Sequence, residues 1–591
     1  MAAPRHQVTL RGSEGMWMVH GPPDYTDNVQ FKRDDSSSCR VMAYSSDGSM
    51  FAWCNGQCTK VIRLSDYKLL HQFQLAKIAQ LCFSPLGTYL ATWQNYQAVK
   101  DNQLASHNLH IWNLKTGEVV NSTIQRKRAV WRPQWSANEK VCAVFASGGV
   151  LCYSDHDFGN IVARLQLPRM EGCVISEGDS PPSVAAYVPV VKGSPAFVRL
   201  YRYPNLGGEG AAIASKSFFK ADNINMLWNK KGTALLAIAS VDVDKTGKSY
   251  YGEQALHYLD TSGQGCTVAL SKTGPIYSVD WNPNSSDFCV VYGFIPSKAT
   301  LFNLKCEPLF EFGTGPRNTV YYNPQGTVLC LAGFGNLRGK MEFWGRSSLK
   351  LVSKIQADDS TQFEWCPDGE HFLTATCSPR LRVGNGYKMW HYSGKLFSEY
   401  SVPREKELWE VVWKPFPAGT FPSKPVIAQQ QSAKQVDAKP AVYRPPNASK
   451  TAASSFKLNE EEPAETLSDK ALSKNALKNK KKREAKAKAK QQEVIGSPLD
   501  SRTSEQRDAL AMASYVLGQA HHTPVTPISA QDENIATETD KKIKSLRKKL
   551  KAIEKLKEQK AGGKVLEANQ LEKVQGEAAL VKELQQLELN G

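Results

Sequence analysis

The chain has 591 residues, of which 41% are hydrophobic and 13 are Trp, and its formal net charge is +17. This composition supports a large folded core, and the positive charge favours an acidic partner, with nucleic acid as the first candidate. No run approaches the ~20 apolar residues of a membrane span, and the N-terminus lacks the apolar region of a signal peptide, so we expect no membrane association.

The use of cysteine indicates a reducing compartment. The 13 Cys are an odd number, and many stand singly inside predicted strands, as Cys82 and Cys289 do. Such residues act as small core-filling side chains with free thiols. Cys54 and Cys58 have no second pair or His cluster nearby, so we interpret them as structural rather than zinc-binding. We therefore expect a cytoplasmic protein without a metal or other cofactor.

A unit of about 40 residues recurs along residues 1–425. Each copy starts with an apolar run that ends in an aromatic residue, and a turn such as Asp368-Gly369, a second strand, a loop and further strands follow. Four short strands cannot bury their own faces, so such units must stack beside one another. The apolar runs at the starts of the copies end at Tyr44, Phe83, Trp135, Trp228, Trp281, Tyr322, Trp365 and Trp413, and a degenerate copy without the aromatic residue has its start at Ile175. These nine starts predict an all-β nine-bladed β-propeller.

The ends of this region predict how the ring closes. Too little chain follows Trp413 for a full blade, whereas the strand-like stretch HQVTLRGSEGMWMVHG precedes the first start. We expect the N-terminal strands to complete the blade that begins at Leu408, which leaves no open sheet edge. Eight blades is the alternative if the copy near Ile175 is not a blade.

The composition changes at Val426, and the following residues carry +8 of the net charge. Residues 426–466 are rich in Gln, Ala, Pro, Lys and Ser, which predicts a disordered linker. Residues 467–492 are rich in Ala and Lys and predict a basic helix. Residues 493–536 are polar with scattered Pro and predict a second disordered linker.

Residues 537–591 have a different pattern. Ile543, Leu546 and Leu550 recur at spacings of three and four, which places them on one face of a helix. The pattern breaks at Gly562-Gly563 and then resumes. We therefore predict an amphipathic helical hairpin that docks on a partner, because it is too small to be very stable alone.

The sequence contains no convincing catalytic motif. Gly247-Lys248-Ser249 resembles the end of a P-loop, but Asp242 occupies the position of the required first Gly. A loop between propeller strands also lacks the helix N-terminus that holds phosphate. There is no GxSxG or HExxH motif. We predict that the protein is not an enzyme; the enzyme alternative predicts a cluster of titratable residues with shifted pKa values in the central channel.

The longest basic loops are expected to open on one face of the propeller, where second strands lead to third strands and blades lead to blades. A cationic rim with aromatic residues suits an RNA backbone and unstacked bases. The alternative is that these cations only keep the loops soluble. The candidate RNA- or ribosome-binding residues in this rim are Arg126, Lys127, Arg128, Lys245, Lys248, Arg317, Arg338, Arg380 and Arg382.

The tail adds two cationic blocks, with the further candidates Lys480, Lys481, Lys482, Arg483, Lys548 and Lys549. They can be interpreted as nuclear localisation signals, as solvated surface, or as contacts to RNA and the ribosome. We favour RNA, because cations on flexible linkers supply salt-sensitive affinity without sequence specificity and can add avidity.

Four runs carry a family resemblance: SFFKADNINMLWNKKGTALL, DVDKTGKSYYGEQALHYL, FGTGPRNTVYYNPQGTVLCLAGFGNLRGKMEFW and CPDGEHFLTATCSPRLRVGNGYKMWHY. Together with LSKNALKN and the terminal DKKIKSLRKKLKAIEKLKEQ, they resemble the single-chain eukaryotic translation initiation factor 2A family. The resemblance implies a nine-bladed propeller that associates with the small ribosomal subunit. It also implies codon-directed binding of initiator methionyl-tRNA without GTP hydrolysis, on particular mRNAs. We further expect the tail to contact other initiation factors.

Two other interpretations remain open. One propeller-containing component of the large multisubunit initiation factor shares similar blade motifs, but it carries an RNA-recognition domain ahead of its propeller, and the residues before Tyr44 are too few to form one. A WD-repeat-type scaffold for protein complexes, without direct RNA contact, is the alternative from a different functional class.

Overall fold

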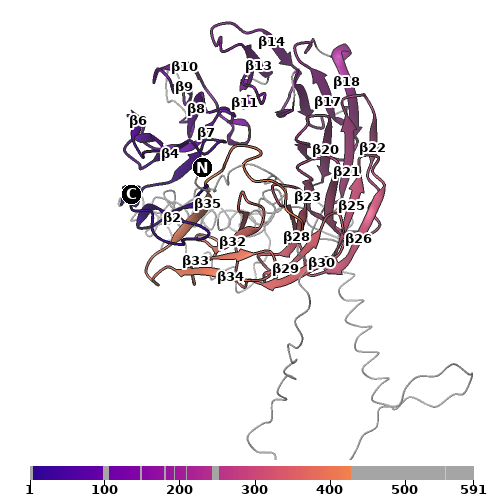
Figure 1. Cartoon of the computed structure of the whole chain (residues 1–591). Helices are drawn as coiled ribbons and strands as arrows, with labels where there is room; N and C mark the ends of the chain where they lie inside the picture. The colour runs from indigo at the N-terminus through magenta and orange to yellow at the C-terminus, as the bar shows by residue number, and fades with distance from the viewer. Residues whose placement is uncertain are drawn as a thin grey trace, which may run out of the picture. The chain divides into compact units, whose positions relative to one another are not determined.

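The computed structural model describes residues 4–426, except 98–105, 147–148, 179–180, 192–193, 208 and 242–251, together with Ile553. The predicted first linker beyond Val426, the basic helix, the second linker and all of the predicted hairpin but Ile553 lie outside the described residues. The described residues form nine antiparallel sheets arranged around a ring (Figure 1). The all-β nine-bladed propeller is thereby confirmed, and the eight-bladed alternative is wrong.

The blades follow one another in chain order, each strand pairing with the next. Blade 1 consists of β3 (Val41–Tyr44), β4 (Met50–Cys54), β5 (Thr59–Arg63) and β6 (Leu69–Phe73), and blade 2 of β7 (Ile78–Phe83), β8 (Tyr89–Gln94), β9 (Leu109–Asn113) and β10 (Val119–Thr123). Blade 3 consists of β11 (Gln134–Trp135), β12 (Val141–Ala146), β13 (Gly149–Ser154) and β14 (Ala163–Gln166), and blade 4 of β15 (Gly172–Ile175), β16 (Ser183–Val188), β17 (Ala196–Arg202) and β18 (Ala212–Phe218).

Blades 5 to 8 have the same meander. Blade 5 consists of β19 (Asn223–Trp228), β20 (Ala234–Ser240), β21 (Gln254–Asp260) and β22 (Gly265–Thr267), and blade 6 of β23 (Ile276–Trp281), β24 (Asp287–Tyr292), β25 (Ser297–Asn303) and β26 (Pro308–Gly315). Blade 7 consists of β27 (Thr319–Tyr322), β28 (Val328–Gly333), β29 (Lys340–Gly345) and β30 (Leu351–Gln356), and blade 8 of β31 (Gln362–Trp365), β32 (His371–Thr376), β33 (Gly386–His391) and β34 (Leu396–Ser401). Every predicted start, including the degenerate copy at Ile175, ends the first strand of a blade.

The ninth blade joins the two ends of the described chain. It is a three-stranded sheet of β35 (Leu408–Trp413), β1 (Gln7–Gly12) and β2 (Gly15–His20). Indigo β2 and orange β35 belong to this one sheet in Figure 1, with β1 between them, although some 390 residues separate them along the chain. The irregular segment after β2 takes the place of a fourth strand through the isolated bridges Met16↔Asp34 and Val19↔Asp27. The predicted closure by the N-terminal strands is confirmed.

Position within a blade explains the sequence pattern of each strand. First strands of neighbouring blades contact one another, as β3 and β7 or β23 and β27 do, so they line the centre of the ring. The second strand β24 is buried at every residue, because neighbouring blades cover both of its faces. The fourth strand β34 is exposed or partly exposed throughout, since it lies at the outer edge of its blade.

The hydrophobic core is divided among the interfaces between blades. At the interface of blades 7 and 8, the Phe343 ring centroid lies 5.6 Å from that of Trp365 and 4.8 Å from that of Phe372. The predicted turn at Asp368-Gly369 fixes this interface, because Gly369 has φ +72° and a Cβ there would lie 1.7 Å from Gln325 Oε1. Among the described residues, no helix is long and apolar enough to cross a membrane.

Candidate nucleic-acid interface

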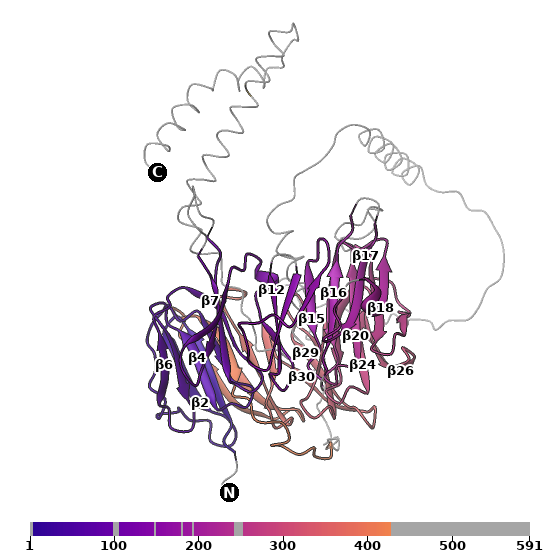
Figure 2. The same cartoon turned by 90° about the horizontal axis from the view of Figure 1, so that it is seen from above.

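The meander sorts the loops of the propeller onto two faces. Successive strands of a blade run in opposite directions, and the strands stand side by side in Figure 2. Loops from second to third strands and connections between blades therefore open at the same end. We call this end the long-loop face; the remaining hairpins open on the opposite face.

The two faces differ in charge. Leaving out residues 21–40, where the chain crosses between the faces, the described connections of the long-loop face hold 14 Lys and Arg against 8 Asp and Glu. The described hairpins of the opposite face hold nearly equal numbers of the two. The positive charge of the propeller therefore lies mainly on the long-loop face, which suits a polyanion.

Three candidate cations lie together in the connection from β10 to β11. Arg126, Lys127 and Arg128 are consecutive and all exposed. Gln125 anchors the backbone beneath them, because its buried Nε2 donates to the carbonyl oxygens of Val130 (3.1 Å) and Phe145 (2.8 Å). Its Oε1 accepts a hydrogen bond from the Lys127 N–H at 3.1 Å. The structure thus holds the loop in place and leaves its cations at the surface.

Two of these cations have neighbouring side chains that leave them available to a ligand. The Arg126 guanidinium lies 5.1 Å from the ring centroid of Tyr96, which places an aromatic ring beside a cation on the long-loop face. Lys127 Nζ lies 3.6 Å from Glu171 Oε1, and both side chains are more than half exposed. An exposed pair of this kind contributes little stability, so Lys127 can exchange Glu171 for a phosphate at small cost.

A second group lies on blades 7 and 8. Arg338, Arg380 and Arg382 are exposed on the loops from β28 to β29 and from β32 to β33. The second loop is anchored by buried Asn385, whose Nδ2 donates to the Leu381 carbonyl oxygen at 2.7 Å. Arg382 Nε is 3.8 Å from Glu407 Oε1, and this pair is partly exposed. Asn318 likewise holds the start of the first loop, because its Nδ2 donates to the Phe334 carbonyl oxygen at 2.9 Å. The three arginines are therefore presented to solvent from loops with anchored bases.

Arg317 does not belong to this rim. Its place in a connection between blades predicts an exposed cation, but its side chain is only 7% exposed. Its Nη2 lies 3.1 Å from Glu342 Oε2, and its Nη1 donates to the Phe312 carbonyl oxygen at 3.4 Å. The acidic residue on the third strand of the next blade draws the guanidinium inward. The exposed position predicted for Arg317 is thus wrong, and the residue links blades 6 and 7.

The remaining candidates fall outside the described residues. Lys245 and Lys248 lie in the gap at 242–251. The tail candidates Lys480, Lys481, Lys482, Arg483, Lys548 and Lys549 also lie beyond the described part of the chain. Their roles stay predictions from sequence.

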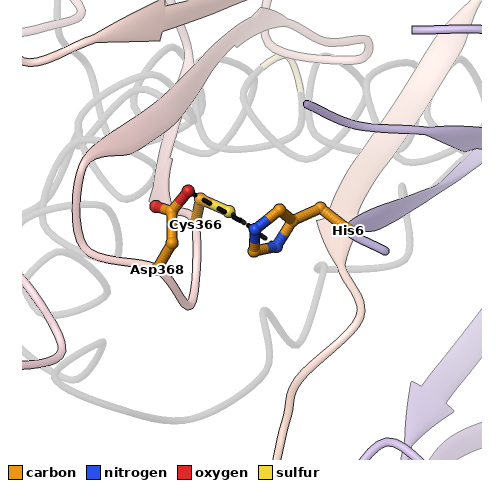
Figure 3. Close-up of side chains that lie close together, drawn as sticks. All are labelled: His6, Cys366 and Asp368. Atoms are coloured by element: carbon orange, nitrogen blue, oxygen red, sulfur yellow. Dashed lines mark hydrogen bonds and ion pairs between the residues drawn. The ribbon is translucent and has the colours of Figure 1, made fainter. Parts of the chain in front are cut away.

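A buried polar cluster lies at the closure of the ring, on the opposite face (Figure 3). His6 lies just before β1, and Cys366 and Asp368 lie in the turn between β31 and β32. Cys366 Sγ is 3.3 Å from His6 Nδ1, and His6 Nε2 is 3.5 Å from Asp368 Oδ2. Asp368 Oδ2 also accepts a hydrogen bond from His371 Nδ1 at 2.7 Å. Sequence reasoning missed this cluster, because no local motif spans the 360 residues between His6 and Cys366.

The cluster includes three potential metal ligands, whose atoms lie within 4.8 Å of one another. The two nitrogens of His6 face different partners, however, and one ion can bind only one of them. Burial raises the pKa of the Cys366 thiol far above its usual range, and Asp368 adds to the effect. Burial alone would raise the pKa of Asp368, but hydrogen bonds from His371 hold it well below normal. The geometry therefore fits a hydrogen-bonded clasp between the N-terminal segment and blade 8 better than a metal centre.

Comparisons with known proteins agree with the motifs. A family model described as "Eukaryotic translation initiation factor eIF2A" matches residues 216–411, and one described as "Eukaryotic translation initiation factor 2A C-terminal domain" matches residues 541–587. A Drosophila melanogaster protein named eukaryotic translation initiation factor 2A is 37% identical, covering 94% of this chain and 93% of its own length. A Schizosaccharomyces pombe protein of the same name is 31% identical, covering 99% and 98%.

More distant relatives mark the limits of this similarity. A Xenopus laevis protein, named as one of the subunits of eukaryotic translation initiation factor 3, is 25% identical and covers only 63% of this chain and 52% of its own length. A solved structure titled "Crystal structure of the eukaryotic initiation factor" is 30% identical with a TM-score of 0.64, over 70% of this chain and all of that one. Identity to the factor 2A proteins extends over nearly the full length of the chain, whereas identity to the factor 3 subunit covers only part of it. The chain therefore belongs to the eukaryotic translation initiation factor 2A family.

Proposed function

We propose that this protein is a non-enzymatic translation initiation factor that binds the small ribosomal subunit through its long-loop face. It promotes codon-directed binding of initiator methionyl-tRNA without GTP hydrolysis, in the cytoplasm, on particular mRNAs. The tail, through its basic blocks, tethers the propeller to RNA and to other initiation factors. Family membership supports a role in translation initiation. The excess of positive charge on the long-loop face supports that face as the binding surface.

The observation that carries this proposal is the pair of exposed cationic groups on anchored loops of one face, Arg126–Arg128 and Arg338 with Arg380 and Arg382. Cations that neutralise phosphates release counterions, so they supply affinity for any RNA backbone and make that affinity salt-dependent. An anchored loop adds to this effect, because little side-chain and backbone entropy is lost when the RNA binds. A protein-binding scaffold would not require this asymmetry of charge.

The enzyme alternative predicted titratable groups with shifted pKa values near the centre of the ring. Burial raises the pKa of Glu364 and of Glu410, which lie on the first strands β31 and β35. Glu410 is ion-paired with Arg11 at 3.0 Å, and Glu364 Oε1 accepts a hydrogen bond from the Trp413 N–H at 3.4 Å. Both contacts join strands at the ring closure, so we assign these carboxyl groups to folding rather than to catalysis.

Charge reversal on the rim should weaken RNA binding. We expect the variant Arg338→Glu, Arg380→Glu, Arg382→Glu to bind small ribosomal subunits and initiator tRNA about tenfold or more weakly at ~150 mM salt. Each lost phosphate contact should also reduce the slope of log K against log salt by about 0.9. Sedimentation with purified subunits and fluorescence anisotropy with labelled tRNA, both without GTP, measure these quantities.

A matched variant controls for total charge. Lys230→Glu, Lys231→Glu, Lys305→Glu makes the same change at three exposed positions of the opposite face. We expect its binding to fall much less than that of the rim variant. Equal losses in the two variants would show that the long-loop face has no special role, and unchanged binding in the rim variant would favour the protein scaffold.

A further inference from the structure

Two cysteines differ from all others in the chain. The structure describes all thirteen, and eleven of them are buried. Only Cys266 and Cys306 are half-buried, and these two lie against each other, with their Sγ atoms 2.8 Å apart. The thiols that a small solvent-borne oxidant can reach are therefore the same two that already have a partner.

The two sulfur atoms belong to neighbouring blades, and the backbone fixes the position of each cysteine. Cys266 lies on β22, the fourth strand of blade 5, where it pairs with Tyr258 of β21. Cys306 lies in the turn between β25 and β26 of blade 6, in a left-handed conformation with φ +64°. Asn303 fixes that turn, because its Oδ1 accepts hydrogen bonds from the N–H groups of Lys305 and Glu307, each at 2.9 Å.

The separation of the sulfur atoms is close to that of a covalent bond. A disulfide places its sulfur atoms about 2.0 Å apart, so closure from 2.8 Å requires a shift of under about 1 Å. Rotation about the Cα–Cβ bonds of the two side chains can shorten the distance between the sulfur atoms. Both residues also pack at the edge of the core cluster between blades 5 and 6, which limits their freedom to separate.

From this geometry we infer that Cys266 and Cys306 are a redox modification site, at which a peroxide forms a disulfide that staples blade 5 to blade 6. The Cys266 thiol and one hydrogen peroxide give a sulfenic acid and one water. The Cys306 thiol then attacks that sulfur, and the new S–S bond forms as the sulfenic oxygen leaves as a second water. Two thiols lose one electron each, and the peroxide is reduced to two waters.

The environment decides the order of these steps. Burial raises the pKa of Cys306, and the adjacent Cys266 adds to the effect, so Cys306 stays protonated near neutral pH. The thiolate is the reactive form of cysteine, which makes Cys306 the poorer first target for peroxide. In the second step Cys306 attacks as its thiol proton passes to the departing sulfenic hydroxyl, which leaves as water. A thiol reductant reverses the bond by exchange.

The staple should affect stability and leave the long-loop face unchanged. Cys266 and the turn of Cys306 lie at the outer edge of the ring, toward the opposite face, away from Arg338, Arg380 and Arg382. The bond would close a loop of about 40 residues that contains the first three strands of blade 6. Closing such a loop restricts the unfolded chain and stabilises the fold.

The test uses the full chain, treated with dilute hydrogen peroxide, alkylated at its remaining thiols and digested for mass spectrometry. We expect a cross-linked pair of peptides that contain Cys266 and Cys306, about 2 Da lighter than their reduced sum, which dithiothreitol separates. This product should form roughly tenfold faster than oxidation at any buried cysteine. Oxidised protein should melt at a higher temperature than reduced protein.

Two variants complete the experiment. Cys266→Ser and Cys306→Ser should each abolish the cross-link and the rise in melting temperature, and circular dichroism confirms that each variant folds. The proposal is overturned if the folded protein forms no cross-link, or if Cys266 is carried on to sulfinic acid with Cys306 unchanged. It is also overturned if other cysteine pairs form disulfides equally fast. The wild-type cross-link decides the matter even if a variant fails to fold.

Discussion

Replacing Arg11 with Ala is expected to lower the free energy of unfolding of the propeller by about 3–5 kcal/mol. Arg11 on β1 and Glu410 on β35 join the two ends of the described chain, with Nε 3.0 Å from Oε2. The residues are 5% and 2% exposed. Burial already raises the pKa of Glu410 and Arg11 opposes this shift, so loss of the guanidinium leaves an uncompensated carboxyl group inside the ninth blade.

The effect exceeds that of a simple ion pair, because Arg11 makes further contacts at the closure. Its Nη1 donates to the Cys39 carbonyl oxygen at 3.2 Å, and its guanidinium lies 5.5 Å from the ring centroid of Trp409. Urea unfolding followed by tryptophan fluorescence measures the loss. The double variant Arg11→Met, Glu410→Leu should recover most of the stability, since it removes both buried charges and keeps the volume.

A control with an exposed ion pair separates the effect of burial from that of the ion pair itself. Arg63 Nε lies 3.2 Å from Asp66 Oδ1 in an exposed turn, and the Arg63 side chain is 50% exposed. Arg63→Ala should therefore cost about 1 kcal/mol or less. If Arg11→Ala costs no more than this control, the buried pair does not stabilise the closure.

Acidification from pH 7.5 to 5.0 is expected to destabilise the propeller, and His257 alone should account for about 2 kcal/mol of the loss. Burial, with a smaller contribution from nearby Lys216, lowers the pKa of His257 from 6.5 to about 4. The residue is 8% exposed, and its Nδ1 lies 3.1 Å from Thr267 Oγ1.

The sign follows from proton binding. Below pH 6.5 the unfolded chain protonates His257 while the folded chain keeps it neutral, until the pH approaches 4. The unfolded state therefore binds more protons, and stability present at neutral pH is lost as the pH falls through this window. Burial lowers the pKa of His6, His110 and His391 as well, so they act in the same direction.

The measurement is the difference in unfolding free energy between pH 7.5 and 5.0, from urea titrations. His257→Gln should reduce that difference by about 2 kcal/mol, because its side chain does not titrate. His156→Asn is the control: His156 is exposed, and Asn tolerates its left-handed backbone at φ +66°. An unchanged difference in His257→Gln would show that His257 titrates equally in the folded and unfolded chain.

The architecture could be predicted from sequence because its signals are local and repeated. Each blade begins with an apolar run that ends at an anchor such as Trp281 or Trp365, and the spacing of these anchors counts the blades. Even Ile175, without an aromatic ring, keeps the order of strand, turn and strand. Closure followed from the same count of strands, since incomplete sheets at the two ends have unpaired edges that must meet.

The candidate site could be predicted only in part. A basic residue in a loop predicts a surface cation, and this held for Arg128 and Arg338, which are exposed. It was wrong for Arg317, which turns inward toward Glu342. The signal for that contact was a single acidic residue within the apolar run of β29, which indicates a buried partner but does not identify it.

The sequence by itself determined the number of blades, their order and the closing of the ring, because strand periodicity and turn chemistry act between near neighbours. The tertiary structure alone decided which distant side chains meet. His6 contacts Cys366 across 360 residues, and Cys266 meets Cys306 across a blade interface. Such contacts depend on the relative rotation and stacking of whole sheets, and no local pattern records that geometry.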